Sequence, residues 1–299
     1  MKHLQPVRLL FLTLILSLSY HPLQAQSGLK SVLERKLRTI VDTTDAVVGV
    51  AIVDLKTGER FSLNGDEVFP LASTIKIPIL AELFRQSSAS KVVLDEPVKL
   101  EKRHQVGGGQ ILQYMTPGST VLTLRDYAHF MIIQSDNSAT NLLIEKLGMN
   151  NINDLLRSAG LQKTRLQRVM MDITAAKEGR ENIGTPDELA ELLKMIHEGK
   201  MVSTGASHQM AAILTIEKDG PLRSAIPWKV KVANKEGELE GARSDCAIVY
   251  LEGNPYIVSV QVKYLKNPGE GTAVIRAISD LTYQYFERLS ASNEYGRRL

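Results

Sequence analysis

Cysteine is almost absent from this 299-residue chain, which contains only Cys246. An intrachain disulfide is therefore impossible, and the stability of the folded chain has to come from its core. Cys246 lies in the β-rich stretch 245–250. We therefore interpret it as a small buried hydrophobic residue, with a reactive thiol as the alternative.

An excess of charge of either sign is also missing. The formal net charge is +3, and Lys2 and Arg8 supply two of these charges. A nearly neutral chain gives no electrostatic basis for binding nucleic acid, so no such partner is expected. The six histidines lack the spacing of metal ligands, and Gly107–Gly109 is not followed by the Lys-Ser/Thr of a phosphate-binding loop. No metal or other cofactor is expected, and the glycines are interpreted as a bend.

Long apolar runs are missing except at the N-terminus. The run Leu9–Ser19 is too short to span a bilayer, follows the positive Lys2 and Arg8, and precedes the small residue Ala25. This pattern predicts a signal peptide over residues 1–25, with an uncleaved N-terminal anchor as the alternative. The mature chain, residues 26–299, is then expected to be periplasmic or secreted and to have no membrane span.

Segments rich in β-branched residues lie toward both ends of the chain. Strands are predicted at 46–55 and 60–63, joined by a turn, and again at 229–233, 244–251 and 256–264. Apolar residues at helical spacing predict a helix over 29–41 and a closing helix over 272–289. A helix is also predicted over 74–85, broken lightly by Pro78.

The middle of the chain is predicted to be helical. Thr123 can cap a helix over 124–134, Gly148 can end a helix over 138–147, and Thr185-Pro186 begins a further helix. The expected fold class is α/β (α+β): an antiparallel sheet built from both chain ends and flanked by helices, plus an all-helical lobe. The α/β lobe would comprise about 26–86 and 209–299, and the helical lobe about 87–208, with a cleft between them.

Three short motifs carry the chemistry. Ser73-Thr74-Ile75-Lys76 places a hydroxyl and an amine three residues apart at a predicted helix start, where they can act as nucleophile and base. Ser135-Asp136-Asn137 follows 62 residues later, and Lys235-Glu236-Gly237 follows after another 100. Each motif alone has an ordinary interpretation, as a helix cap, a solvated lysine or a turn. Their order, however, is typical of serine enzymes that use S-x-x-K, S-D-N and K-T-G.

On these residues the chain resembles the class A β-lactamase family of penicillin-recognising serine enzymes. The stretches around Met131–Asn141, Leu222–Ala225 and Gly241–Asp245 are also similar to that family, so the likeness covers nearly all of the mature chain. The resemblance implies the β-lactamase/transpeptidase-like fold. It also implies a hydrolase that opens the amide of a β-lactam through an acyl-enzyme, without a metal.

The resemblance assigns a role to each motif. Ser73 would be the nucleophile, Lys76 would move its proton, and Ser135 would relay a proton to the leaving nitrogen. The backbone N–H groups of Ser73 and Glu238 would form the oxyanion hole. The expected catalytic residues are Ser73, Lys76, Ser135 and Lys235. The expected substrate-binding residues are Asn137, Glu236, Gly237, Glu238 and Arg243.

One departure from the family concerns the water that clears the acyl group. The resemblance places a water-activating glutamate about 17 residues before Pro186, where this chain has Val169. Asp172 is close by and is the candidate substitute, although its side chain is shorter. Without a substitute the acyl-enzyme is expected to persist.

A second departure is Glu236, which stands where the family has a hydroxyl residue. A carboxylate there opposes the binding of an anionic ligand, unless it points away or pairs with Lys235 or Arg243. Three functions stay open: a β-lactamase, a penicillin-binding protein or D-alanyl peptidase on the same fold, and a binding module without activity. The expected partner is a small β-lactam or a cell-wall peptide, and the chain is expected to be a monomer.

Overall fold

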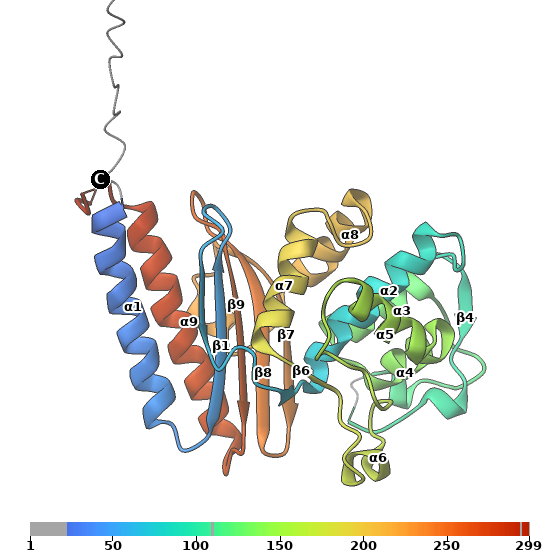
Figure 1. Cartoon of the computed structure of the whole chain (residues 1–299). Coiled ribbons are helices and arrows are strands. Elements are labelled where there is room, and N and C mark those ends of the chain that lie inside the picture. Colours follow the sequence, from blue (N-terminus) through green and yellow to red (C-terminus); the bar gives the residue numbers. More distant parts are fainter. Residues whose placement is uncertain (1–22, 109–110, 294, 299) are drawn as a thin grey trace, which may run out of the picture.

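The computed structural model describes residues 23–108, 111–293 and 295–298 of the chain. Most of the predicted signal peptide, residues 1–22, lies outside the described residues. The described part contains a five-stranded antiparallel sheet of order β2-β1-β9-β8-β7 (Figure 1). Its strands are β1 Val47–Asp54, β2 Arg60–Leu63, β7 Lys231–Leu239, β8 Ala242–Tyr250 and β9 Tyr256–Lys263. The predicted sheet from both ends of the chain is thereby confirmed.

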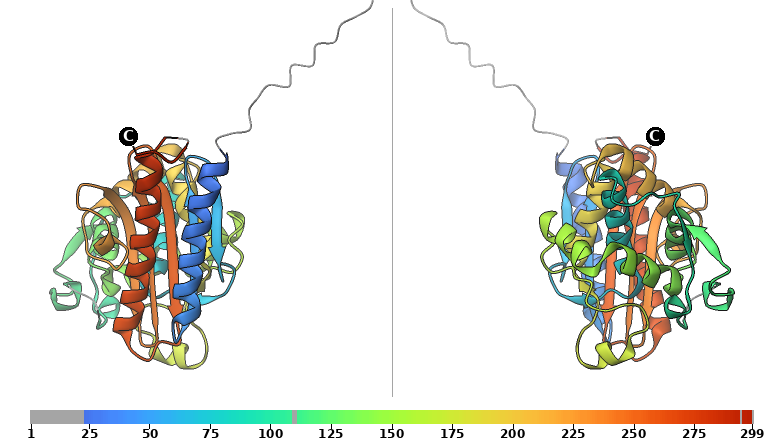
Figure 2. Two further views of the ribbon diagram at one scale, coloured as in Figure 1. Left: turned by 90° about the vertical axis from the view of Figure 1, so that its left-hand side faces the viewer. Right: turned by 90° about the vertical axis from the view of Figure 1, so that its right-hand side faces the viewer.

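Two long helices cover one face of the sheet. The helix α1, Leu23–Thr43, lies beside α9, Pro268–Ser290, although they come from opposite ends of the chain (Figures 1 and 2). Apolar residues of both helices join those of the strands in one buried cluster. The rings of Tyr256 on β9 and Phe286 on α9 stack at a centroid distance of 4.2 Å. This packing holds α1 and α9 against one face of the sheet.

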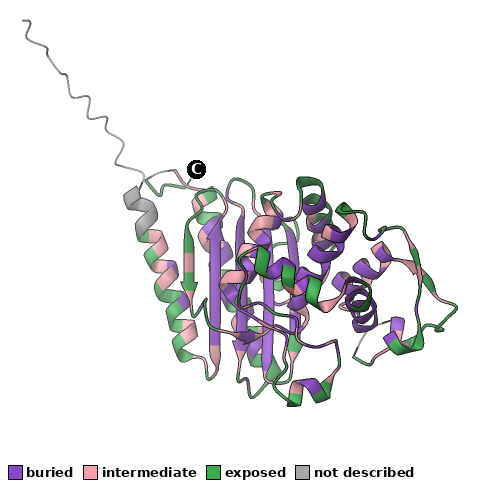
Figure 3. Cartoon of the chain, turned by 45° about the vertical axis from the view of Figure 1, so that its right-hand side comes forward, coloured by how far each residue is buried: buried purple, intermediate pink, exposed green. Residues whose placement is uncertain are grey.

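The other face of the sheet packs against α7 Pro186–His197 and α8 Thr204–Thr215, and the remaining helices from the middle of the chain lie beyond them (Figure 1). These are α2 Lys76–Ser88, α3 Leu124–Ile133, α4 Asn137–Leu147 and α5 Met149–Ser158. A second buried cluster runs from the strands through α2 into α3, α4 and α5, and every residue of α2 from Lys76 to Phe84 is buried (Figure 3). The division of the chain into two lobes stays a prediction.

Shorter elements complete the described part. Two small sheets pair β3 Phe69–Pro70 with β6 Ile183–Gly184, and β4 Pro97–Lys99 with β5 Val121–Thr123. The short helix α6 is Ile173–Lys177, and four 3-10 helices are η1 Ala72–Ile75, η2 Lys102–His104, η3 Leu112–Tyr114 and η4 Arg223–Ala225. None of the helices in the described ranges combines the length and apolar character needed to cross a bilayer.

The predicted caps of two helices are confirmed. The Thr123 side chain accepts a hydrogen bond from the backbone N–H of Asp126 at the start of α3. Thr185 does the same for Glu188 at the start of α7, with Pro186 in its first turn. Gly148 follows the last residue of α4 with φ of +83°, a conformation that glycine adopts without strain.

Several predicted boundaries were wrong. The helix expected over 74–85 is a 3-10 turn followed by α2, which begins at Lys76, so Pro78 falls in the first turn, where no intrahelical N–H bond is lost. The helix expected from Ser138 begins at Asn137, because Asp136 caps it by accepting from Ala139 N–H at 2.9 Å. The strand expected at 229–233 continues to Leu239, so Lys235, Glu236 and Gly237 lie within β7 rather than at its end.

Candidate active site

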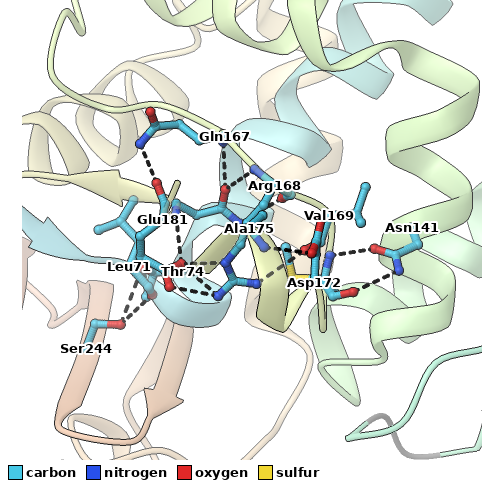
Figure 4. Close-up of polar contacts among 12 residues, drawn as sticks. Leu71, Thr74, Asn141, Gln167, Arg168, Val169, Asp172, Ala175, Glu181 and Ser244 are labelled. Carbon is cyan, nitrogen blue, oxygen red and sulfur yellow. Dashed lines mark hydrogen bonds and ion pairs between the residues drawn. The ribbon is translucent and has the colours of Figure 1, made fainter. Parts of the chain in front are cut away.

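Ser73 lies in the tight turn η1, directly before α2. Its neighbours Leu71 and Thr74 are fully buried, whereas Ser73 itself is half-buried. The Leu71 carbonyl accepts hydrogen bonds from the hydroxyls of Thr74 and Ser244 at 2.7 and 2.8 Å (Figure 4). Ala72 has a φ of +49°, an uncommon value for a residue with a Cβ. The turn is therefore held on both sides, with the Ser73 side chain left partly open to solvent.

Lys76 connects the first motif to the second. It is fully buried, and its Nζ donates to the Ser135 carbonyl at 2.7 Å, the Ser135 hydroxyl at 3.1 Å and Asn137 Oδ1 at 3.0 Å. Ser135 has a φ of +51°, the kind of strained backbone that is found at functional sites. Burial, and then the charge of Lys235, lower the pKa of Lys76 well below its usual value. A lysine in this state can serve as a base.

The third motif reaches Ser73 through Gly237. A Cβ atom on Gly237 would lie 2.6 Å from the Ser73 backbone nitrogen and 2.7 Å from the Leu71 carbonyl oxygen, so β7 can approach this closely only with glycine there. Lys235, two residues earlier, is 2 % exposed, and burial lowers its pKa to about 8. The three motifs therefore meet at the turn that carries Ser73.

Glu236 and Glu238 form ion pairs with one arginine. Arg243 Nη2 donates to Glu236 Oε2 at 2.6 Å, and Arg243 Nη1 pairs with Glu238. Glu238 lies directly opposite Arg243 in the β7–β8 register, whereas Glu236 is its diagonal neighbour. The open question about Glu236 is answered: its carboxylate turns toward Arg243, and its side chain remains 34 % exposed.

Comparisons with known proteins agree with this arrangement. A sequence model described as the β-lactamase enzyme family matches residues 32–286. The chain belongs to this family. It is 28 % identical to β-lactamase CARB-3 of Pseudomonas aeruginosa over 233 residues, which is 76 % of this chain and 80 % of that protein.

Solved structures give the same answer for the fold. A β-lactamase from Sphaerobacter thermophilus matches with a TM-score of 0.78 and 29 % identity, over 87 % of this chain and 97 % of that one. A protein called PBP-A matches with a TM-score of 0.79 and 27 % identity, over 86 % and 96 % of the two chains. The predicted membership of the class A β-lactamase family and the β-lactamase/transpeptidase-like fold are both confirmed, and the chain is a β-lactamase-type hydrolase.

In this member of the β-lactamase family, Asp172 stabilises the start of a short helix. Its side chain caps the short helix α6 by accepting from the backbone N–H of Ala175 at 2.9 Å (Figure 4). One carboxylate oxygen is thus engaged, and the residue is half-buried. That Asp172 activates a water stays a prediction.

The segment before Asp172 is attached to the site by a residue that the sequence analysis missed. Asn141 accepts from the Met170 N–H at 2.7 Å and donates to the Met170 carbonyl at 3.1 Å (Figure 4). A signal existed: Asn141 lies four residues after Asn137, on the same face of α4. The residue held against the Asn137-bearing face of α4 is therefore Met170, which is buried. Counting back 17 residues from Pro186 had pointed to Val169 instead.

The same loop is anchored by a second missed pair. Arg168, which is 7 % exposed, donates from Nε and Nη2 to the carboxylate of Glu181, each at 3.0 Å (Figure 4). Next along the chain, the thioether of Met171 lies near Asn137, since a Cβ on Gly108 would be 3.1 Å from Met171 Sδ and 3.4 Å from Asn137 Nδ2. Two methionines thus occupy the loop where the family resemblance expects a carboxylate.

The remaining candidate residues have structural roles. His104 accepts from the Glu101 N–H at 3.1 Å and lies 3.2 Å from Glu145. No group of three His, Cys, Asp or Glu side chains that could hold a metal occurs among the described residues. Cys246 is fully buried, and burial raises the pKa of its thiol well above the usual value, which confirms its interpretation as a hydrophobic core residue.

Proposed function

We propose that this chain opens the amide bond of β-lactams through an acyl-enzyme on Ser73. The observation that carries the proposal is the position of Lys76. Its buried amine, three residues after Ser73, contacts both Ser135 and Asn137. Nucleophile, base and proton relay would then lie within one small volume, which is the arrangement that covalent catalysis by a serine requires.

In the proposed acylation step, the Ser73 hydroxyl attacks the lactam carbonyl and Lys76 takes its proton. The proton passes through Ser135 to the ring nitrogen as the C–N bond breaks. The backbone N–H groups of Ser73 and Glu238 would stabilise the developing oxyanion, and loss of one such donor typically costs about 3 kcal/mol of barrier. Asn137 would bind the amide side chain of the substrate, and Lys235 would support its carboxylate.

The low pKa of Lys76 leads to a prediction about pH. Acylation requires the neutral amine, so its rate should rise with pH through the pKa of Lys76. Part of the lowering of that pKa comes from the charge of Lys235. Replacing Lys235 with methionine should therefore raise the pKa of Lys76 and move the acidic limb of the acylation profile to higher pH. Acylation rates from pH 4 to 9, followed by stopped-flow absorbance, check this.

The matched control is Lys231→Met, which removes the same charge from an exposed position on β7. Its profile should match that of the unmodified chain. An acidic limb that stays in place in the Lys235 variant would show that another group is the base.

We further propose that deacylation is slow, because methionines occupy the loop that should supply a carboxylate. Enzymes commonly turn over at about 10 per second, and a general base contributes about 10²- to 10⁴-fold. An acyl-enzyme without that base should therefore live for about ten seconds to about fifteen minutes. Nitrocefin should give a burst of one equivalent followed by a slow phase, and rapid acid quenching with mass spectrometry should show an adduct on Ser73.

Two results would contradict these proposals separately. Hydrolysis at full speed without an accumulated adduct would show that another group activates the water, with Asp172 as the first candidate to test. Absence of both adduct and hydrolysis would contradict the β-lactam substrate itself. The alternative of a penicillin-binding protein is not favoured, because the family model and the curated relatives are named for β-lactamases.

The location and assembly of the chain also belong to this proposal. The pattern of residues 2–25 supports export through a signal peptide, to the periplasm or the medium. There the enzyme would meet β-lactams before they reach their targets and would contribute to antibiotic resistance. We propose that it acts as a monomer.

A further inference from the structure

A pocket lies on the face of β7 that carries the Glu236 side chain, one residue before the glycine that touches the turn of Ser73. It has a volume of about 470 Å³, and its lining includes Asp219, Trp228, Glu236 and Arg243. Gly237, whose Cβ position is in contact with the Ser73 nitrogen, is the next residue after Glu236, about 3.3 Å along the strand. β7 is the edge strand of the sheet (Figure 1). Successive side chains of a strand point to opposite faces, so a substrate attached to Ser73 would have to cross this open edge to reach the pocket beside Glu236.

The two arginines of the pocket are already paired. Arg223, which is 3 % exposed, donates to Glu217 at 2.9 Å and to the Ile226 carbonyl at 2.7 Å, and its guanidinium lies 4.3 Å from the Trp228 ring centroid. Arg243 is paired with both Glu236 and Glu238. Both guanidinium groups are therefore engaged, and because Arg243 faces two carboxylates, the cluster of Arg243, Glu236 and Glu238 has one negative charge in excess.

Carboxylates outnumber guanidinium groups among the lining residues of the pocket and their direct ion-pair partners, although the buried Lys235 lies beside Glu236. Its lining and the direct ion-pair partners of that lining contain the carboxylates of Glu217, Asp219, Glu236 and Glu238 against the two guanidinium groups. The Glu236 side chain is 34 % exposed. The Trp228 indole, which is 68 % exposed, adds an aromatic surface of the kind that binds organic cations. Both features favour a positively charged group.

We propose that this pocket binds a cationic substituent of the substrate and that Glu236 determines this specificity. The inference rests on the proposed function, because it concerns the substrate of Ser73. Favoured substrates are zwitterionic β-lactams, in which a quaternary nitrogen lies beside the ring and enters the pocket. A substrate with a neutral or anionic group at that place forgoes the attraction of Glu236 or is repelled by it.

Two cephalosporins with the same thienylacetamido side chain test the proposal. One carries a pyridinium at ring position 3 (cephaloridine), and the other carries a neutral acetoxymethyl group there (cephalothin). The second-order rate of Ser73 acylation is measured for each, and the ratio of the two rates is compared between the unmodified chain and Glu236→Gln. The intrinsic reactivities of the two compounds cancel in this comparison. The preference for the pyridinium compound should fall about five- to tenfold in the variant.

Glu240→Gln is the matched control, because it removes the same charge just after β7 at an exposed residue that does not line the pocket. This variant should keep the full preference. For the unmodified chain, the preference should also decline as salt rises from 0.05 to 0.5 M, since partly exposed charges are screened (about a 10 Å Debye length at 0.1 M).

The possible outcomes separate the inference from the function on which it rests. A Ser73 adduct with both compounds, but with an unchanged ratio in Glu236→Gln, would overturn the inference and leave the proposed function in place. An equal fall in both variants would also overturn it, because the effect would then be one of net charge. No adduct with either compound would contradict the proposed function and remove the basis of the inference.

Discussion

Replacing Ser73 with alanine is expected to abolish acylation by penicillins and cephalosporins, with a fall in rate of about 10⁴- to 10⁶-fold. The substitution removes the atom that forms the new bond, and Lys76 and Ser135, which are hydrogen-bonded to each other, would be left without a nucleophile to serve. Mass spectrometry of the quenched reaction and nitrocefin absorbance measure the loss.

Stability should change little in this variant. Ser73 is half-buried and its neighbours Leu71 and Thr74 hold the turn through contacts that the substitution leaves intact. Ser88→Ala, at the exposed end of α2, is the matched control and should keep full activity. Turnover that survives in Ser73→Ala, with an adduct on another residue, would show that the nucleophile lies elsewhere.

The order of the three motifs was enough to predict the fold, because it pointed to a family whose fold brings the three motifs to one place. Local signals such as the Thr123 and Thr185 caps and the β-branched runs of β1 and β9 specify their elements independently of the rest of the chain. The family resemblance supplied the arrangement of these elements, and the structure agrees with it.

The contacts that determine specificity could not be predicted in the same way. Whether Glu236 meets Lys235 or Arg243 depends on the register of β7 against β8, and the predicted strand ended at residue 233, before the part of that register that contains Glu236. The positive φ values of Ala72 and Ser135 are likewise imposed by the packing around them and leave no trace in residue type.

The two hydrogen bonds between Asn141 and Met170, called the clamp from here on, show most clearly what could not be predicted from the sequence. Counting residues from Pro186 identified Val169, but a loop can shift its register by one residue without any sign in the sequence. Only the paired hydrogen bonds of Asn141 show which residue is held next to α4. Asn141 and Met170 are 29 residues apart in the sequence, so the contact between the Asn141 side chain and the Met170 backbone arises only when the chain folds.

This clamp yields the second large prediction. Met170→Glu is expected to accelerate deacylation about a hundredfold, within the range that a positioned general base contributes. Asn141 would hold the new residue by its backbone, as it holds Met170 now, on the side of the site that carries Asn137 and Lys76. The burst of nitrocefin hydrolysis should then merge into a fast steady state, and the adduct should disappear from quenched samples.

Met170→Gln separates the effect of a base from that of polarity, since glutamine has nearly the same shape as glutamate but cannot take a proton from water. It should leave the adduct as long-lived as in the unmodified chain. Equal acceleration by both variants would mean that the methionine acts by excluding water rather than by lacking a carboxylate. No acceleration by Met170→Glu, in a chain that still acylates normally, would show that the clamp directs residue 170 away from the acyl group.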